Sequence, residues 1–343
     1  DGWTELDLDL HVADHRLLRL FPAKEAKAQP APVKWEELSR LEGPVPVTLH
    51  EPNVLILDRA AWSLDGGDWQ PVDEVLRVDN LVRHAIGLPH RHGDIAQPWA
   101  EPDVEPTHSV ALKFTIHCDV PVAAPALAME RAGEAVVSLN GQALRTKPAG
   151  FFVDEDIETV VLPDLAVGEH TLIVQWPFRP GHGLEACYLL GDFGVSVAGT
   201  NLRVTAPVRE LAFDDWTKQG LPFYGGNVTY HCKANLPEGR TALRIPKFEA
   251  PLVTVDLGGK RLGRILRAPF RLEIPKTSGE AQLDLICFGD RINTFGPLHN
   301  CNPKEKNWGP KAARTEGEHW TDGYIVRPKG ICVAPILEKK AAQ

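Results

Sequence analysis

The 343-residue chain lacks several features that would place it in a common functional class. It contains no run of 18 or more apolar residues, so the sequence predicts no transmembrane helix. Its first residues do not show the pattern of a signal peptide. No long acidic or basic run accompanies the formal net charge of −9, which argues against nucleic acid and against a membrane surface as main partners.

Two common catalytic and nucleotide-binding motifs are also missing. Gly191-Asp192-Phe193-Gly194 lies in a strand context and matches neither a Rossmann nor a P-loop pattern. No Gly-x-Ser-x-Gly nucleophile elbow is present. We therefore expect no cofactor and assign no catalytic residue from the sequence.

Cysteines are too few for a disulfide scaffold, with six in the whole chain. Most lie in apolar strand-like runs such as Leu285-Ile286-Cys287-Phe288, which favours buried free thiols. A Cys118–Cys187 or a Cys232–Cys287 bridge is the alternative, so the compartment, bacterial cytoplasm or secretion, stays open.

Glycine and proline are frequent instead, at 29 each, as expected for many short strands joined by turns. The most informative stretch is 135–144. Val137 and Leu139 alternate with Ser138, which is a strand pattern. Asn140-Gly141 follows, the dipeptide that a type I′ hairpin turn favours, so this stretch predicts a β-hairpin.

The same pattern recurs roughly 110 to 120 residues later. Residues 253–262 repeat the hairpin with Gly258-Gly259 in the turn. Residues 228–232 match 114–118, and 279–285 match 168–174, in the same order. We interpret this as two copies of one β-domain, with small differences in loop length.

The rest of the chain divides around these copies. The chain opens with Leu6, Leu8 and Leu10 in a strand-like alternation, so 1–50 is expected to be the tail of an upstream β-sandwich plus a linker. Residues 51–106 are expected to be a connector with one helix, which Asp73 would cap and Gly87 would end. The two β-domains are then placed at 107–202 and 203–338, with Gly323–Val326 as the last strand.

The hairpin and the later Gly-Glu-x-x-Leu strand resemble the galactose-binding-like jelly roll, an accessory β-sandwich of glycoside hydrolases. Residues 51–58 and 221–230 resemble the C-terminal half of large bacterial enzymes of the rhamnosidase-like, family 2 sugar-binding type. This resemblance implies an all-β fold of tandem jelly-roll sandwiches with a short helical connector. It also implies an upstream catalytic domain in the same polypeptide and carbohydrate as a partner.

Two stretches carry candidate sugar contacts. Tyr224 and Asn227 lie at a strand entrance, where an aromatic face and an amide suit a sugar. Packing of Phe223 and Tyr224 between domains is the alternative. The second stretch, 289–300, resembles an "Arg-Asn-Thr-x-Gly-Pro-His" phrase of those enzymes and leads into a long polar loop. Its candidate sugar contacts, with one from that loop, are Asp290, Arg291, Asn293, His299 and Trp308.

Other polar clusters are more consistent with surface or structural roles. The acidic groups at 154–156, 214–215 and 316–318 are expected to be solvated loop charges rather than a glycosidase pair. His90, His92 and Asp94 are too few for a zinc site. The paired His-Cys at 117–118 and 231–232 would point to opposite faces of a strand, so no metal site is predicted.

The sequence thus predicts a non-catalytic accessory or carbohydrate-binding region of a larger glycoside hydrolase. One alternative is a stand-alone carbohydrate-binding protein. Another is a fragment whose residues 289–300 contact substrate in a glycosidase active site.

Overall fold

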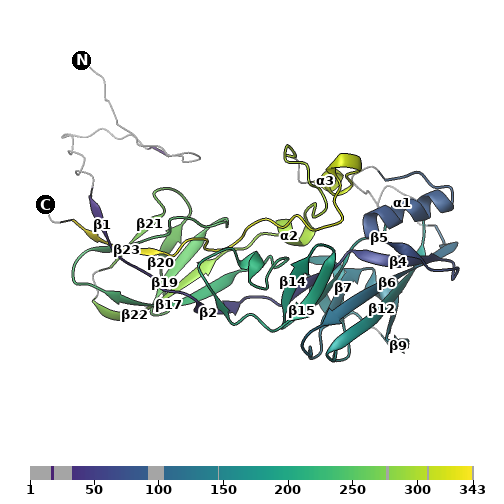
Figure 1. Cartoon of the computed structure of the whole chain (residues 1–343), viewed down its shortest axis with the longest axis horizontal. Coiled ribbons are helices and arrows are strands. Elements are labelled where there is room, and N and C mark those ends of the chain that lie inside the picture. The colour runs from purple at the N-terminus through teal and green to yellow at the C-terminus, as the bar shows by residue number, and fades with distance from the viewer. Residues whose placement is uncertain are drawn as a thin grey trace, which may run out of the picture.

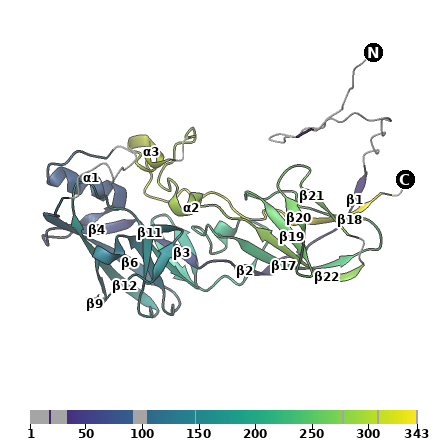
Figure 2. The ribbon, with the colours of Figure 1, turned by 180° about the vertical axis from the view of Figure 1, so that it is seen from behind.

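In the computed structural model the chain is described at residues 17–18, 33–91, 104–145, 147–275, 278–306 and 309–341. These residues form two β-sandwiches that lie side by side along the long axis of the molecule (Figures 1 and 2). The predicted all-β class is confirmed. No helix of the described part is long and apolar enough to cross a membrane. The predicted strand with Leu6, Leu8 and Leu10 lies outside the described residues.

The first sandwich packs a five-stranded sheet against a larger one. The five-stranded sheet has the order β10 (Gly150–Phe152), β11 (Asp154–Val161), β7 (Ala126–Glu130), β13 (Cys187–Gly191) and β3 (Asn53–Leu57). The larger sheet has the order β14 (Gly194–Ala198), β15 (Asn201–Thr205), β6 (His108–Cys118), β12 (Gly168–Phe178), β8 (Val136–Leu139) and β9 (Gln142–Leu144). At its margin β4 (Arg59–Leu64) pairs with both β6 and β5 (Gln70–Glu74).

The second sandwich repeats this plan. One sheet has the order β1 (Trp35–Arg40), β23 (Ile336–Lys340), β18 (Thr241–Arg244) and β21 (Arg271–Ile274). The other has the order β16 (Glu210–Leu211), β2 (Val45–Leu49), β17 (Val228–Leu236), β22 (Gly279–Cys287), β19 (Val253–Leu257) and β20 (Lys260–Ile265). The run β17-β22-β19-β20 has the same order as β6-β12-β8-β9, so the predicted internal repeat is confirmed.

Both predicted hairpins are confirmed in register and turn geometry. Leu139 pairs with Gln142 across Asn140 and Gly141, whose φ values are 51° and 79°. In the second copy Leu257 pairs with Lys260 across two glycines with φ of 55° and 78°. Two successive positive φ values define the type I′ turn, which Asn-Gly and Gly-Gly adopt at low cost.

The two sandwiches are nested rather than tandem. Strand β1 pairs with β23 and β2 pairs with β17, so residues 35–49 belong to the second sandwich and not to an upstream domain. The first sandwich, from β3 to β15, is inserted between β2 and β16. The expected division at 50, 106 and 202 therefore does not follow the strand pairing. Local patterns missed this because the partners of β1 and β2 lie far away in the sequence.

The expected connector at 51–106 is part of the first sandwich where it is described. Its strands β3, β4 and β5 pair within that sandwich. The predicted helix is present as α1 (Val75–Ala85), with Gly87 at a φ of 76° just beyond its end. Its N-cap is Glu74 rather than Asp73, since the Glu74 carboxylate accepts hydrogen bonds from the Leu76 and Arg77 amides.

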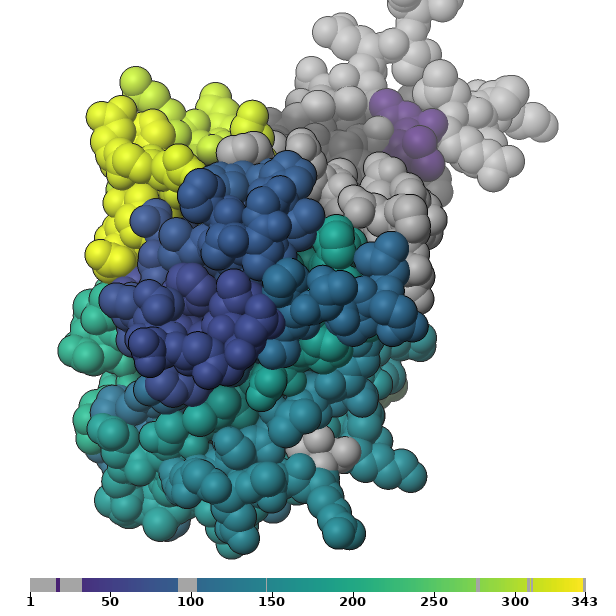
Figure 3. Space-filling model, turned by 90° about the vertical axis from the view of Figure 1, so that its right-hand side faces the viewer, coloured from purple at the N-terminus to yellow at the C-terminus, as the bar shows by residue number. Residues whose placement is uncertain are grey.

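A long segment, residues 288–335, leaves the second sandwich between β22 and β23. It carries α2 (Ile292–Phe295), α3 (Pro310–Ala313) and the 3-10 turn η4 (Gly317–His319). Figure 1 shows α3 close to α1, and Figure 3 shows this yellow segment against the blue α1 region. Leu298 joins the core of the first sandwich, so the segment is packed. The strand expected at Gly323–Val326 is wrong, because these residues are irregular and the last strand is β23.

Candidate functional site

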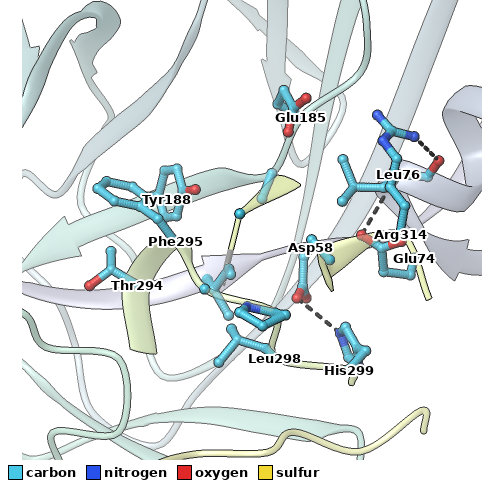
Figure 4. A pocket seen from close by; sticks show the side chains of 16 residues that line it. Asp58, Glu74, Leu76, Glu185, Tyr188, Thr294, Phe295, Leu298, His299 and Arg314 are labelled. Atoms are coloured by element: carbon cyan, nitrogen blue, oxygen red, sulfur yellow. Dashed lines mark hydrogen bonds and ion pairs between the residues drawn. The ribbon is translucent and has the colours of Figure 1, made fainter. Parts of the chain in front are cut away.

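A cavity of about 290 Å³ lies where the 288–335 segment covers the first sandwich (Figure 4). One wall comes from the end of β3, the start of α1 and the residues before β13. The opposite wall is formed by residues 294–299 and 309–314. Strands β3 and β13 are antiparallel neighbours, so the end of one and the approach to the other meet at one edge of the sheet.

The floor of the pocket is a buried polar group built around Asp58. Its carboxylate accepts a hydrogen bond of 2.7 Å from the Tyr324 hydroxyl and faces the His299 Nε2 atom at 3.1 Å. The His299 Nδ1 atom lies 2.9 Å from the Thr321 carbonyl oxygen, which can only accept. Both ring nitrogens therefore donate, which makes His299 an imidazolium.

The environment of His299 agrees with this protonation state. Burial lowers the pKa of His299, but the hydrogen bond and charge of Asp58 and the charge of Glu74 outweigh it and raise the pKa. The Trp320 ring stacks on the imidazole with centroids 4.9 Å apart. The ring is therefore held in place from three sides.

Glu74 lies beside this group and is buried, with 5% of its surface exposed. Both carboxylate oxygens are used as helix caps, at 3.0 Å from the Leu76 nitrogen and 3.1 Å from the Arg77 nitrogen. Burial raises the pKa of Glu74 to about 7, and the charge of Asp58 adds to this rise. The cap bonds oppose the rise but do not cancel it.

Two polar groups of the lining have no hydrogen-bond partner among the described residues. One is the Glu185 carboxylate, which keeps an exposed surface in the pocket. Burial by the surrounding protein and the charge of Glu130 raise the pKa of Glu185, an effect that solvent in the open pocket weakens. The other is the hydroxyl of Tyr188, a residue that is only 8% exposed. Figure 4 shows both side chains at the cavity.

An aromatic surface adjoins these two groups. The Phe295 ring contacts the Tyr188 ring edge-on, with centroids 5.4 Å apart, and Phe152 lies behind both. Phe295 is 38% exposed, although it is a large apolar side chain at the cavity wall. An exposed ring beside polar groups is the surface that stacks on the apolar face of a sugar.

Tyr224 and Asn227, which the sequence predicted as sugar contacts, lie elsewhere. Tyr224 has no exposed surface, and its hydroxyl donates to the Asn227 carbonyl oxygen at 2.8 Å and accepts from the His50 amide at 3.0 Å. The Asn227 side chain accepts from the Gly289 amide. These residues join β2, β17 and the start of the 288–335 segment, the packing role that the sequence left open as the alternative.

Three residues of the 289–300 stretch also form contacts within the fold, where the 288–335 segment leaves the second sandwich. Arg291 forms a bidentate ion pair with Glu51, and the Asp290 carboxylate lies 2.6 Å from the Lys329 ammonium. The Asn293 side chain bonds to the backbone of Arg327 in both directions, at 2.8 and 3.0 Å. A sugar contact by any of them stays a prediction.

Among the predicted contacts, His299 is the residue that the structure places in the pocket wall. Trp308 lies outside the described residues. The sequence missed Asp58, Glu74, Glu185 and Tyr188. Asp58 carried a weak signal, as an acidic residue directly after the apolar run 54–57. Glu185 carried none.

Of the remaining polar clusters, His92 and Asp94 lie outside the described residues, and the described clusters show no shared site. Asp215 caps the 3-10 turn η3 (Trp216–Lys218), and residues 154–156 are exposed on β11. His231 bonds to Asp284 and Thr48, while Cys232 points into the core. Across the part of the chain that the structure describes, no group of three metal-ligating side chains could hold an ion. All six cysteines are free thiols, so neither of the two alternative bridges forms.

No protein-family model and no curated protein matches this chain. Among solved structures, a rhamnosidase from Novosphingobium sp. PP1Y aligns with a TM-score of 0.29 and 16% identity, over 69% of this chain and 23% of its own. A GH2 beta-galacturonidase from Eisenbergiella tayi aligns with a TM-score of 0.24 and 13% identity, over 71% of this chain and 37% of its own.

An anti-sigma factor domain-containing protein from Clostridium clariflavum aligns with a TM-score of 0.22 and 10% identity, over 69% of this chain and 90% of its own. The chain spans 23% and 37% of the two glycosidases, which are both much longer proteins.

Proposed function

We propose that this chain binds carbohydrate in the pocket beneath the 288–335 segment, as a non-catalytic region of a larger glycoside hydrolase. The observation that carries the proposal is the pair of uncommitted polar groups, the Glu185 carboxylate and the Tyr188 hydroxyl, beside the exposed ring of Phe295. A buried hydroxyl without a partner costs free energy unless a ligand or water satisfies it.

Sugar chemistry fits these groups. Sugar hydroxyls can donate to the Glu185 carboxylate and both donate to and accept from the Tyr188 hydroxyl. The C–H face of the ring can stack on Phe295. The other polar groups, around Asp58 and Glu74, are already hydrogen-bonded within the fold. They therefore keep the walls in place without rearrangement on binding, which lowers the cost of binding.

The hydrogen bonds of the pocket carboxylates also support an accessory role rather than a catalytic one. Glycoside hydrolysis takes two carboxyl groups that act on opposite sides of the bond. Asp58 and Glu74 each use both carboxylate oxygens inside the protein, which leaves Glu185 as the free carboxyl among the described lining residues. The partner that we propose for this region is a catalytic domain of the same polypeptide.

The test is a screen of the purified chain against immobilised glycans, followed by titration calorimetry on the hits. We expect Glu185→Gln and Tyr188→Phe each to weaken binding about tenfold, or by about 1.4 kcal/mol, since Gln replaces one acceptor oxygen by a donor and Phe lacks the hydroxyl. Glu238→Gln, an exposed change on the second sandwich, is the matched control and leaves the affinity unchanged.

Two results would overturn the proposal. Absence of binding to any glycan by a folded chain would remove the binding role. Turnover of chromogenic glycosides that disappears in Glu185→Gln would replace the accessory role with a catalytic one.

A further inference from the structure

Some of the acidic residues around the pocket have a cationic partner and others do not. The Asp58 carboxylate faces the His299 imidazolium. Asp79, a buried residue of α1, is shared by two guanidinium groups, Arg83 at 3.4 Å and Arg314 at 3.5 Å. Glu74 has only backbone amides as partners. Glu185 has no ion-pair or hydrogen-bond partner among the described residues, so the cavity holds one carboxyl group that the fold leaves unpaired.

The two cations of the lining are already paired within the fold. Arg314 donates one nitrogen to the Leu76 carbonyl oxygen at 3.0 Å and directs another toward Asp79. Both nitrogens of His299 are used by Asp58 and Thr321. An anionic ligand would therefore meet carboxyl groups, and cations that already have partners in this lining.

We infer that the ligand of this pocket is a sugar that carries a protonated amine, with the ammonium against Glu185 and a ring oxygen or hydroxyl against Tyr188. This inference rests on the proposed carbohydrate binding and narrows its ligand class. An ammonium supplies three donors and the positive charge that the lining lacks, and charge-assisted hydrogen bonds are about twice as strong as neutral ones.

Two further features favour an ammonium over a neutral donor. Burial and then the charge of Glu130 raise the pKa of Glu185, and the positive charge of Arg314 opposes this rise without cancelling it, so an ammonium placed against Glu185 would favour its ionised form. The exposed ring of Phe295 adds a surface on which a cation is attracted to the ring quadrupole.

The experiment compares four methyl glycosides that share one ring: glucosamine, glucose, N-acetylglucosamine and glucuronate. Titration calorimetry on the whole chain is run at a pH where the amine is protonated. We expect the amine to bind at least tenfold more tightly than glucose or the N-acetyl derivative, and the glucuronate to bind most weakly.

The Glu185→Gln variant should bring the amine and the neutral sugar to within about twofold of each other, with some binding of both retained. Thermal unfolding checks that the variant is folded. The N-acetyl ligand removes the charge from the sugar instead of from the protein, so the wild-type comparison stands even if the variant fails to fold.

The outcomes separate the two proposals. Equal affinity of the wild-type protein for the glucose and glucosamine glycosides refutes the proposed preference for an amine and leaves the proposed carbohydrate binding intact. Preference for glucuronate also refutes it. Absence of binding to all four sugars, and to every glycan in the screen, refutes both.

Discussion

Substitution of a buried helix cap should change how stability depends on pH. In the folded chain the pKa of Glu74 is about 7, whereas the unfolded value is about 4.5. A carboxyl whose pKa is raised by folding binds its proton more tightly in the folded state. Stability is therefore unaffected below about pH 4.5 and falls as the pH rises from there through 7.

The size of this loss follows from the two pKa values. A difference of one in pKa is worth about 1.36 kcal/mol, so Glu74 costs the folded state about 3 kcal/mol at pH 8 and less than about 1 kcal/mol at pH 5. Gln at this position has nearly the same shape and cannot ionise. It still offers one acceptor to the helix amides, and losing the other costs about 1 kcal/mol at every pH.

The assay is urea unfolding of wild type and Glu74→Gln at pH 5, 6, 7 and 8. We expect the free energy of unfolding of wild type to fall by about 2.5 kcal/mol more than that of the variant over this range, because only wild type can ionise at residue 74. Glu238→Gln, on the exposed surface, should keep the wild-type slope. Parallel pH profiles for wild type and Glu74→Gln would refute the reasoning.

Three other changes have definite expectations. Asp58→Ala should cost about 3–5 kcal/mol in urea unfolding, more at pH 6 than at pH 9, because it leaves the buried His299 imidazolium unpaired; an equal loss at both pH values would contradict this. Val153→Gly should stabilise the folded chain by about 1 kcal/mol in thermal unfolding, because Val153 is exposed and has a φ of 66°, which a β-branched residue adopts at a cost. The control is Val167→Gly at an exposed position with a negative φ, which should destabilise the chain. A thiol reagent should modify at most the two half-buried cysteines in the native chain and all six in denaturant; rapid modification of more would contradict the packing.

Local patterns predicted the repeated part of the fold well. The alternation around Asn140-Gly141 and the later Gly258-Gly259 sets both strands and turn within a few residues, so a hairpin is visible in sequence. The nesting was not visible. Strand β1 pairs with β23 across almost the whole chain, and nothing in either segment specifies the other.

The candidate site was predicted only in part for the same reason. His299 stood out because it lies in a loop dense in polar residues. The lining is assembled from segments around positions 58, 74, 185 and 299, which meet only after both sandwiches have formed. A single Glu between apolar residues, such as Glu185, carries no local signal, because its role depends on a cavity that other segments enclose.

The insertion of one sandwich into the other has a consequence for synthesis on the ribosome. The strands β1 and β2 emerge before the inserted unit, but their partners β17 and β23 are made only after it. During that interval two strand edges have no partner, the situation in which chains pair with the wrong neighbour. In that interval the strands of the inserted sandwich can pair with one another, but its core still lacks the 288–335 segment that covers it. The pocket is thus among the last features to be completed, and an arrested chain that ends before β22 would contain Glu185 but not the wall that encloses it.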